Sequence, residues 1–404
     1  MRKMRRPNRN GYTLNLDPAQ ISRRDFLRGS AQLGAALLLP GMLAGCSDDD
    51  DTDNSHWWNW PLEQKIAQMM LVGFRGTALT DDNPIVRAIR DYRIGGVTLY
   101  DYDVILKQYG RNITSPAQLQ ALTAALQTLT RTPLFIAVDQ EGGRIVRLKE
   151  RYGFPPTVSA QSLGMADDLI LTAQAADGIA GTLVENGLNL NLAPVVDLNV
   201  NPDNPVIGKL ERSFSADPAV VTRHAGEVVA VQRRRGVMSA LKHFPGHGSS
   251  AGDSHQGFVD VTETWSEIEL LPYQNLIGAD LCDLVMTAHI YNARLDADYP
   301  ATLSRPIITG LLREQLGFTG VVVTDDLQMG AIAQYYSYET AVIRTLDAGV
   351  DILLVANNLA YDPDVVPKTL DIVLSAIARG ELDAQRIDES CSRIMALKGQ
   401  YRLV

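Results

Sequence analysis

The chain has 404 residues, of which 46% are hydrophobic and 21% are charged, and its formal net charge is −10 at pH 7. Residues 1–45 hold eight Lys/Arg and two Asp/Glu, so the chain without them carries a formal charge of −16. A surface this acidic argues against nucleic acid as a partner.

The first segment in the chain, residues 1–45, is predicted to be a targeting signal. Its stretch SRRDFLRGS contains the pair Arg23 and Arg24 and resembles a twin-arginine export signal. The apolar run that follows is too short to span a bilayer comfortably, and it ends at Cys46 in a sequence that resembles a lipobox. We therefore expect an exported protein, lipid-anchored through Cys46 to a bacterial membrane and facing the periplasm or the cell exterior. The alternative is a buried amphipathic helix with a chance cysteine.

A short acidic tether is expected over residues 46–57, because its run SDDDDTDNS has no apolar surface to bury. No second linker follows, so residues 58–404 are expected to form one domain. Of its two cysteines, Cys282 lies in an apolar run and is predicted to be a buried small hydrophobic residue. No disulfide bond between Cys282 and Cys391 is expected.

Short apolar runs alternate with helical patterns throughout this domain. Strands are predicted within residues 94–100, 133–139, 187–197, 237–243, 281–289, 320–326 and 351–356, and helices within 115–129, 169–187, 218–236 and 338–349. Strands that are apolar throughout belong to a parallel sheet covered by helices. Seven to eight such units predict a single-domain (β/α)8 barrel of the TIM type with an irregular or missing strand. An open doubly wound sheet is the alternative.

Ionisable side chains stand at the ends of four predicted strands, which end in Asp139, Lys242 with His243, His289 and Asp325. Barrel enzymes carry their chemistry at the carboxyl ends of the strands, where the loops converge. Four independent strands with this property predict a functional cleft. The glycine-rich stretch EGGRIVR lacks dinucleotide-binding spacing, so no nucleotide cofactor is expected.

The stretch KHFPGHGSSAGDSH, residues 242–255, contains three of the six histidines of the chain. Pro245 and Gly246 keep the first two of them from sharing one helix face, as a zinc-binding H-E-x-x-H motif requires. A loop site made of His247, Asp253 and His255 is an alternative, although Lys242 would bring a cation close to the metal. We expect no metal and no cofactor.

Asp253 and His255 are two residues apart, so in an extended loop both side chains point to the same side. The carboxylate can then hold one ring nitrogen and leave the other to transfer a proton near neutral pH. Asp325 would supply a carboxylate nucleophile, which completes the arrangement of a retaining glycosidase. The alternative is that Asp253 and His255 only hold the loop in its conformation.

The motifs DQEGGRIVRL, APVVDLN, ERSF, KHFPGHG, DSH, VMTAHI and TDDLQMGAI resemble, in this order, those of family 3 glycoside hydrolases, and in particular the single-domain β-N-acetylhexosaminidase branch. The resemblance runs from about residue 60 to the C-terminus. It implies Asp325 as the nucleophile, His255 as the acid/base residue and Asp253 as its partner. It also implies a sugar-binding set: Asp139, Arg147, Arg212, Lys242 and His243.

The activity that the resemblance implies is a retaining exo-β-N-acetylglucosaminidase, which removes terminal β-linked N-acetylglucosamine from peptidoglycan fragments or chitooligosaccharides. We expect a monomer whose partners are such glycans and, through its anchor, the membrane. A β-glucosidase of the same superfamily is one alternative, but such enzymes usually carry a second sandwich domain. A lipid-anchored glycan-binding protein without turnover is the other.

Three features depart from the family pattern. Ser249 stands where an aspartate is common, the stretch YDYDVILKQYGRN after the first predicted strand is longer than usual, and the lipid anchor is unlike cytoplasmic members. The long stretch predicts a different cleft rim. A histidine in place of an acid/base carboxylate also repels an anionic acceptor less, which leaves phosphorolysis open as a side activity.

Overall fold

The computed structural model describes residues 56–404. The predicted signal over residues 1–45, the lipidation of Cys46 and nearly all of the tether lie outside these residues. Within the described part, no helix combines the length and the apolar character that crossing a bilayer requires.

Eight parallel strands form the central sheet, in the order β10-β1-β2-β5-β6-β7-β8-β9. The two outermost strands also meet, through a bridge between Val323 and Ile352 and a hydrogen bond of 3.0 Å from the Thr324 amide to the Ile352 carbonyl. The predicted barrel is therefore confirmed, with an irregular seam between β9 and β10, and the open sheet is wrong. The strands are β1 (Met70–Gly73), β2 (Gly96–Thr98), β5 (Phe135–Val138), β6 (Leu190–Asn191), β7 (Met238–Phe244), β8 (Leu284–Thr287), β9 (Val321–Val323) and β10 (Leu353–Val355).

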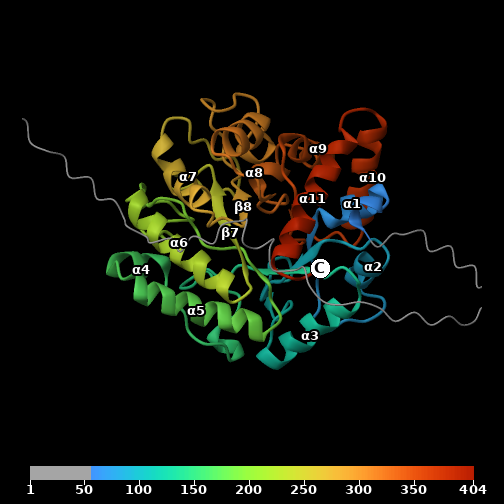
Figure 1. The fold of residues 1–404 in the computed structure, drawn as a ribbon, viewed down its shortest axis with the longest axis horizontal. Helices are drawn as coiled ribbons and strands as arrows, with labels where there is room; N and C mark the ends of the chain where they lie inside the picture. Colours follow the sequence, from blue (N-terminus) through green and yellow to red (C-terminus); the bar gives the residue numbers. More distant parts are fainter. Residues whose placement is uncertain (1–55) are drawn as a thin grey trace, which may run out of the picture. The chain divides into compact units, whose positions relative to one another are not determined.

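Helices surround these strands in chain order, and the last helix returns to the side of the first (Figure 1). The Lys65 ammonium lies 2.7 Å from a carboxylate oxygen of Asp388, and Lys398 donates a 2.8 Å hydrogen bond to Gln68, so α1 and α11 are directly joined. The helices are α1 (Leu62–Gln68), α2 (Pro84–Arg90), α3 (Pro116–Thr128), α4 (Ala160–Ala166), α5 (Leu169–Glu185), α6 (Pro218–Arg234), α7 (Leu271–Gly278), α8 (Gly330–Ala333), α9 (Tyr338–Ala348), α10 (Val365–Ala378) and α11 (Ala384–Gln400), with the π-helical segment η5 (Pro306–Gln315) after β8.

The predicted helices are present as α3, α5, α6 and α9, and the local sequence explains where they begin and end. The Ser115 and Asp217 side chains accept hydrogen bonds from the first turns of α3 and α6, and each of these helices has a proline in its first turn. Gly349, with a φ of 110°, ends α9 in a left-handed conformation that glycine adopts without strain.

Strand β1 is the one strand of the eight-stranded barrel that the sequence pattern did not predict. Its residues Met70–Gly73 follow α1 almost directly, and all four are buried. It pairs with β2 and β10, so the barrel is complete with eight strands and none is missing.

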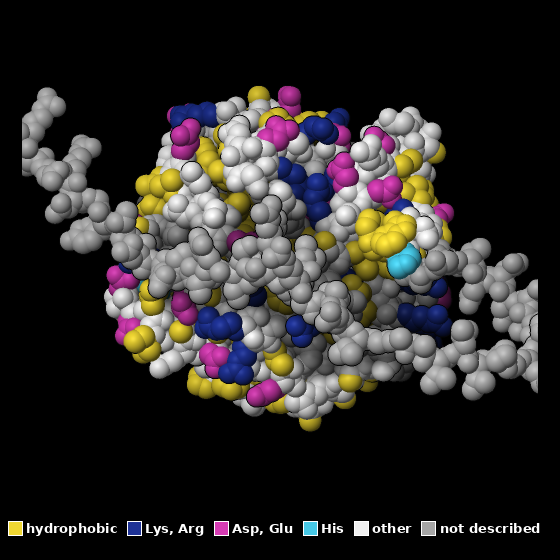
Figure 2. Space-filling view, viewed as in Figure 1, with side chains coloured by type: hydrophobic (Ala, Val, Ile, Leu, Met, Phe, Trp, Pro, Cys, Tyr) yellow, Lys and Arg dark blue, Asp and Glu magenta, His cyan; other side chains and the backbone are white. Residues whose placement is uncertain are grey.

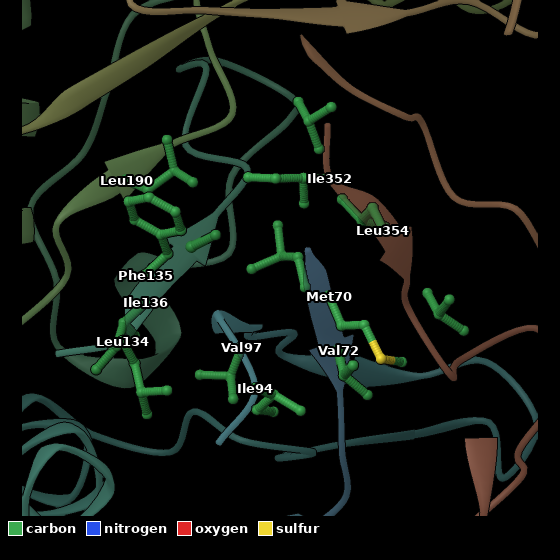
Figure 3. Close-up of a cluster of buried hydrophobic side chains, with 14 of the residues drawn as sticks. Met70, Val72, Ile94, Val97, Leu134, Phe135, Ile136, Leu190, Ile352 and Leu354 are labelled. Carbon is green, nitrogen blue, oxygen red and sulfur yellow. The ribbon is translucent and has the colours of Figure 1, made fainter. Parts of the chain in front are cut away.

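Apolar side chains of neighbouring strands fill the core. Figure 3 shows one part of this cluster, in which Met70 and Val72 of β1 lie on the same face of the sheet as Val97 of β2, while Phe135 of β5 and Leu354 of β10 lie on the other face. Each of these side chains is at most 2% exposed. Burial of a large apolar side chain contributes about 1.5–3 kcal/mol, so this core holds the strand ends that carry the polar groups in fixed positions.

The surface carries charges of both signs, which lie in small separate groups on the face drawn in Figure 2. Several form ion pairs between neighbouring elements, such as Arg235 with Asp177 at 2.6 Å and Arg223 with Asp167 at 3.0 Å. Exposed pairs of this kind contribute about 0–1 kcal/mol each. The buried core, rather than surface charge, therefore stabilises the barrel.

Candidate active site

A cavity of about 260 Å³ opens at the carboxyl ends of the strands. Segments that follow β2, β5, β7, β9 and β10 all contribute to its wall, as expected for a barrel enzyme. The predicted site residues that line it are Asp139, Arg147, Arg212, Lys242, His243, His255 and Asp325.

The floor of the cavity is built around Lys242, whose side chain is 2% exposed. Its ammonium lies 2.9 Å from a carboxylate oxygen of Asp139 and 2.7 Å from one of Glu141. Arg147 donates to the other oxygen of Asp139 at 3.1 Å, and Arg212 binds both oxygens of Glu141 at 2.7 and 2.8 Å. Two carboxylates and three cations therefore share one buried network.

Burial opposes ionisation of both carboxyl groups, but the neighbouring cations outweigh it. The charges of Lys242 and Arg147 hold the pKa of Asp139 well below its usual range. Arg212 and Lys242 lower the pKa of Glu141 to about 2. Charged acceptors and donors next to each other are what the vicinal hydroxyl groups of a sugar require, because each hydroxyl both donates and accepts.

His243 lies beside this floor, but both of its ring nitrogens already have protein partners. Nδ1 is 2.7 Å from Asp197 Oδ2, and Nε2 is 3.2 Å from an Arg212 nitrogen. Arginine can only donate, so Nε2 accepts and Nδ1 donates its proton to Asp197. His243 can therefore meet a sugar only through its ring face, or through Nε2 once Arg212 moves away.

Asp325 follows β9 and lies half-buried at the cavity wall. The Asp326 amide donates to its Oδ1 at 2.8 Å. Burial opposes its ionisation, but the nearby imidazoles of His289, His243 and His255 outweigh this effect and keep the pKa of Asp325 below its ordinary value. The group is thus an anion that is held next to the cavity, as a nucleophile must be.

Asp326, the next residue, has a different environment. One of its oxygens accepts hydrogen bonds from the amides of Ala356 at 3.0 Å and Gln328 at 3.2 Å. Burial raises the pKa of Asp326 to about 7. This residue therefore ties the segment after β9 to the end of β10 across the irregular seam.

His289 lies two residues after the end of β8 and is buried. Its Nε2 is 2.9 Å from the Asp326 carbonyl oxygen, and its Nδ1 is 2.7 Å from the Thr302 hydroxyl. Burial lowers its pKa. It supports the segment that carries Asp325 and is not among the residues that line the cavity.

Asp253 and His255 lie together on the loop after β7. His255 Nδ1 is 2.9 Å from Asp253 Oδ1, which also accepts from the His255 amide at 2.9 Å, while Gln256 donates to Oδ2 at 3.0 Å. Burial opposes ionisation of Asp253, but these hydrogen bonds keep its pKa below the ordinary value. The His255 side chain is 54% exposed, so its Nε2 can exchange protons with a bound molecule or with water.

His247 lines the cavity, but both of its ring nitrogens hold the loop. It is buried, its Nδ1 is 2.7 Å from the Ser250 hydroxyl, and its Nε2 is 3.2 Å from the Ser254 hydroxyl. Burial lowers its pKa to about 4, so the ring is neutral at physiological pH. Across residues 56–404, no three His, Cys, Asp or Glu side chains are arranged to hold a metal ion, so His247, Asp253 and His255 do not form the alternative metal site.

Two charged residues that shape the site were not among the predicted ones. Glu141 neutralises Lys242 and Arg212, and Asp197 accepts both the His243 ring proton and, at 2.8 Å, the His247 amide. Asp197 follows the apolar pair VV just as Asp325 follows VVVT, so the strand-end pattern could have identified it. Glu141 lies two residues beyond Asp139, and the same i, i+2 rule that pairs Asp253 with His255 applies to it.

The long stretch after β2 forms the hairpin β3 (Tyr102–Asp103) and β4 (Gln108–Tyr109) at the cavity rim. Tyr102 and Val104 line the cavity. The Asp103 carboxylate pairs with Arg75 and Arg111, and the Val104 amide donates to Asn358 at 3.0 Å. The longer stretch therefore builds one side of the rim and joins it to the loop after β10.

A (β/α)8 barrel whose cavity combines a buried carboxylate, an imidazole–carboxylate pair and a charged floor has the layout of a barrel glycoside hydrolase. Residues 61–397 match the family model described as the glycosyl hydrolase family 3 N terminal domain. The chain belongs to glycoside hydrolase family 3, as its motifs predicted.

Relatives in this family carry hexosaminidase names. The chain is 36% identical over 333 residues to beta-hexosaminidase A of Pseudoalteromonas piscicida, covering 77% of this chain and 54% of that protein. It is 34% identical over 347 residues to beta-hexosaminidase LpqI of Mycobacterium tuberculosis, covering 83% and 82%. The chain thus spans about half of the first relative and about four fifths of the second.

Solved structures that resemble this chain are also named as β-N-acetylglucosaminidases and β-N-acetylhexosaminidases. A glycoside hydrolase family 3 β-N-acetylglucosaminidase from Paenibacillus sp. superposes with a TM-score of 0.77 at 36% identity, over 85% of this chain and 63% of that one. A β-N-acetylhexosaminidase from Beutenbergia cavernae superposes with a TM-score of 0.74 at 30% identity, over 84% of this chain and 99% of that one.

Proposed function

We propose that this protein is a retaining exo-β-N-acetylglucosaminidase that releases terminal β-linked N-acetylglucosamine from peptidoglycan fragments or chitooligosaccharides. The observation that carries the proposal is the presence of Asp325 and His255 on one cavity, above a charged floor. The names of the relatives and the matching structures support it.

In the first step, the Asp325 carboxylate attacks the anomeric carbon of the terminal sugar while His255 gives its Nε2 proton to the glycosidic oxygen. The carbon–oxygen bond to the leaving group breaks, and a glycosyl ester on Asp325 forms. The low pKa of Asp325 keeps it ionised for this attack. Asp253 stabilises the imidazolium that His255 must be before it donates.

In the second step, His255 takes a proton from a water molecule, which attacks the same carbon and releases Asp325. Two displacements leave the anomeric configuration unchanged. Asp139, Lys242 and Arg147 form the floor on which the sugar hydroxyl groups would rest, and a cavity enclosed at the rim by the hairpin favours a chain end over a chain interior.

The direct test compares turnover of aryl β-N-acetylglucosaminide and aryl β-glucoside by the chain from Ser47 onward. We expect strong preference for the N-acetyl substrate, a β-configured first product by NMR, and no effect of EDTA. Preference for the glucoside would instead assign a β-glucosidase, and no turnover of either would assign a glycan-binding protein. Adding phosphate tests whether water or phosphate accepts the glycosyl group, because phosphorolysis yields the sugar 1-phosphate in place of the free sugar.

We also propose that the full chain is exported and lipid-anchored through Cys46, and that it acts as a monomer. The order of arginine pair, apolar run and cysteine supports the anchor. In cells of a host with twin-arginine export, Cys46→Ser should move the protein from the membrane fraction to a soluble fraction. An unchanged distribution between the two fractions would contradict lipidation at this residue.

A further inference from the structure

The loop that carries Asp253 and His255 rests against α8, the short helix that begins shortly after Asp325. The Gly330 amide donates to the His255 carbonyl oxygen at 3.2 Å, and the Ala331 amide donates to the Ser254 carbonyl oxygen at 3.1 Å. The Gln334 side chain donates to the Gln256 carbonyl oxygen at 2.9 Å. Three consecutive carbonyl groups of the loop are therefore held by one segment.

The contact at Gly330 is so close that only glycine fits. A Cβ atom on residue 330 would lie 2.8 Å from the His255 carbonyl oxygen and 2.9 Å from the backbone carbon of Gln256. Both are backbone atoms of the loop, so they cannot turn aside as the end of a side chain could. Any larger residue at this position must push the loop away from α8.

The opposite side of the loop is also held. Ser254 is 3% exposed and its hydroxyl lies 3.2 Å from Nε2 of the buried His247, while its neighbour His255 faces outward with 54% of its side chain exposed. The turn at these residues therefore points the Ser254 hydroxyl into the protein and the His255 imidazole outward. The loop is thus clamped between His247 below and α8 at its side.

We propose that Gly330 and Gln334 are positioning residues for proton transfer by His255. They hold the loop of His255 at a fixed position relative to the segment that carries the nucleophile Asp325. This inference rests on the proposed function. Proton donation needs His255 Nε2 within about 3 Å of the glycosidic oxygen, and misplacement by about 1 Å costs on the order of 10²-fold in rate. A contact between α8 and the loop therefore decides how well the acid is placed.

The test uses two substrates that differ in how much they need the acid. The disaccharide N,N′-diacetylchitobiose has a poor leaving group that must be protonated, whereas 2,4-dinitrophenyl β-N-acetylglucosaminide has a leaving group that departs unprotonated. For Gly330→Ala we expect kcat/KM to fall on the order of 10²-fold for the disaccharide and to change little for the dinitrophenyl substrate. Gln334→Ala, which removes one hydrogen bond and fills no space, should show the same pattern with a loss of about tenfold.

Azide gives a second readout that a general structural defect would not produce. It attacks the glycosyl ester without a base, so it should raise the turnover of the dinitrophenyl substrate by Gly330→Ala and yield the β-glycosyl azide. Gly181→Ala in α5, where an added Cβ meets no atom within 4 Å, and Gln385→Ala, an exposed position in the first turn of α11, are the matched controls. Both controls should keep the wild-type ratio between the kcat/KM values of the two substrates.

Equal losses on the two substrates would overturn the inference, because they would point to damage of Asp325 or of the floor. Wild-type rates in both variants would overturn it as well. If Gly330→Ala does not fold, as judged by its thermal unfolding, Gln334→Ala alone decides. Failure of the proposed function is distinguishable, because the wild-type protein would then turn over neither substrate and the inference would fall with it.

Discussion

Asp325→Ala should lower kcat on aryl β-N-acetylglucosaminide by on the order of 10⁴-fold or more, which corresponds to about 5 kcal/mol of transition-state stabilisation. The reason is that the variant has no carboxylate to form the glycosyl ester, whereas the floor of Asp139, Lys242 and Arg147 is intact. The measurement is steady-state kinetics beside thermal unfolding, with Asp347→Ala on α9 as the control for loss of an exposed aspartate.

The configuration of the product formed with azide distinguishes this variant from one that is impaired in proton transfer. In Asp325→Ala, azide would attack the substrate itself from the face that the carboxylate occupied, and this single displacement gives the α-glycosyl azide. In a variant with a misplaced His255, two displacements give the β-glycosyl azide. A rate for Asp325→Ala within tenfold of wild type would mean that another group is the nucleophile.

Lys242→Met should destabilise the protein by about 3–5 kcal/mol, the usual cost of removing one partner from a buried ion pair. The Lys242 ammonium is 2% exposed and contacts Asp139 and Glu141, so its loss leaves two buried carboxylates with only the arginines as counter-charges. Urea unfolding at pH 7 measures the difference, and Lys209→Met, which removes an exposed lysine, gives the baseline.

The pH dependence of this difference checks its electrostatic origin. Glu141 has a pKa of about 2 in the folded protein, below its unfolded value, so its stabilising contribution is present above about pH 4.5 and is lost as the pH falls toward 2. The variant lacks the cation that lowers this pKa. The gap between wild type and Lys242→Met should therefore narrow as the pH falls below about 4.5, and a constant gap would indicate lost packing instead.

The barrel could be predicted from sequence because its strands are buried on both sides and read as continuous apolar runs. β1 escaped this pattern for a physical reason. Its four residues MLVG follow the apolar positions of α1 without a turn signal, and hydrophobic periodicity alone does not separate a short buried strand from the end of a helix. The irregular seam was also invisible, since it depends on pairing between β9 and β10 at single residues such as Val323 and Ile352.

The strand-end pattern predicted where the cavity lies, but not which role each residue has within it. In the pair Asp325–Asp326, sequence gives no reason for one carboxyl group to be ionised and the other to have a pKa of about 7. The difference comes from the surroundings in space. At Asp325 the nearby imidazoles outweigh the effect of burial, whereas at Asp326 burial outweighs the hydrogen bonds from the amides of Gln328 and Ala356. Arg212 ends no strand, so only the family resemblance pointed to it.

The junction of α1 with α11 bears on how the chain could be rewired. Lys65 and Gln68 on the first helix contact Asp388 and Lys398 on the last, so the described ends of the ring already touch each other. No residue that lines the cavity belongs to either helix. A circular permutation could link these helices and open the ring at an exposed loop. It would change the order of the β/α units along the chain and leave the geometry of the site in place.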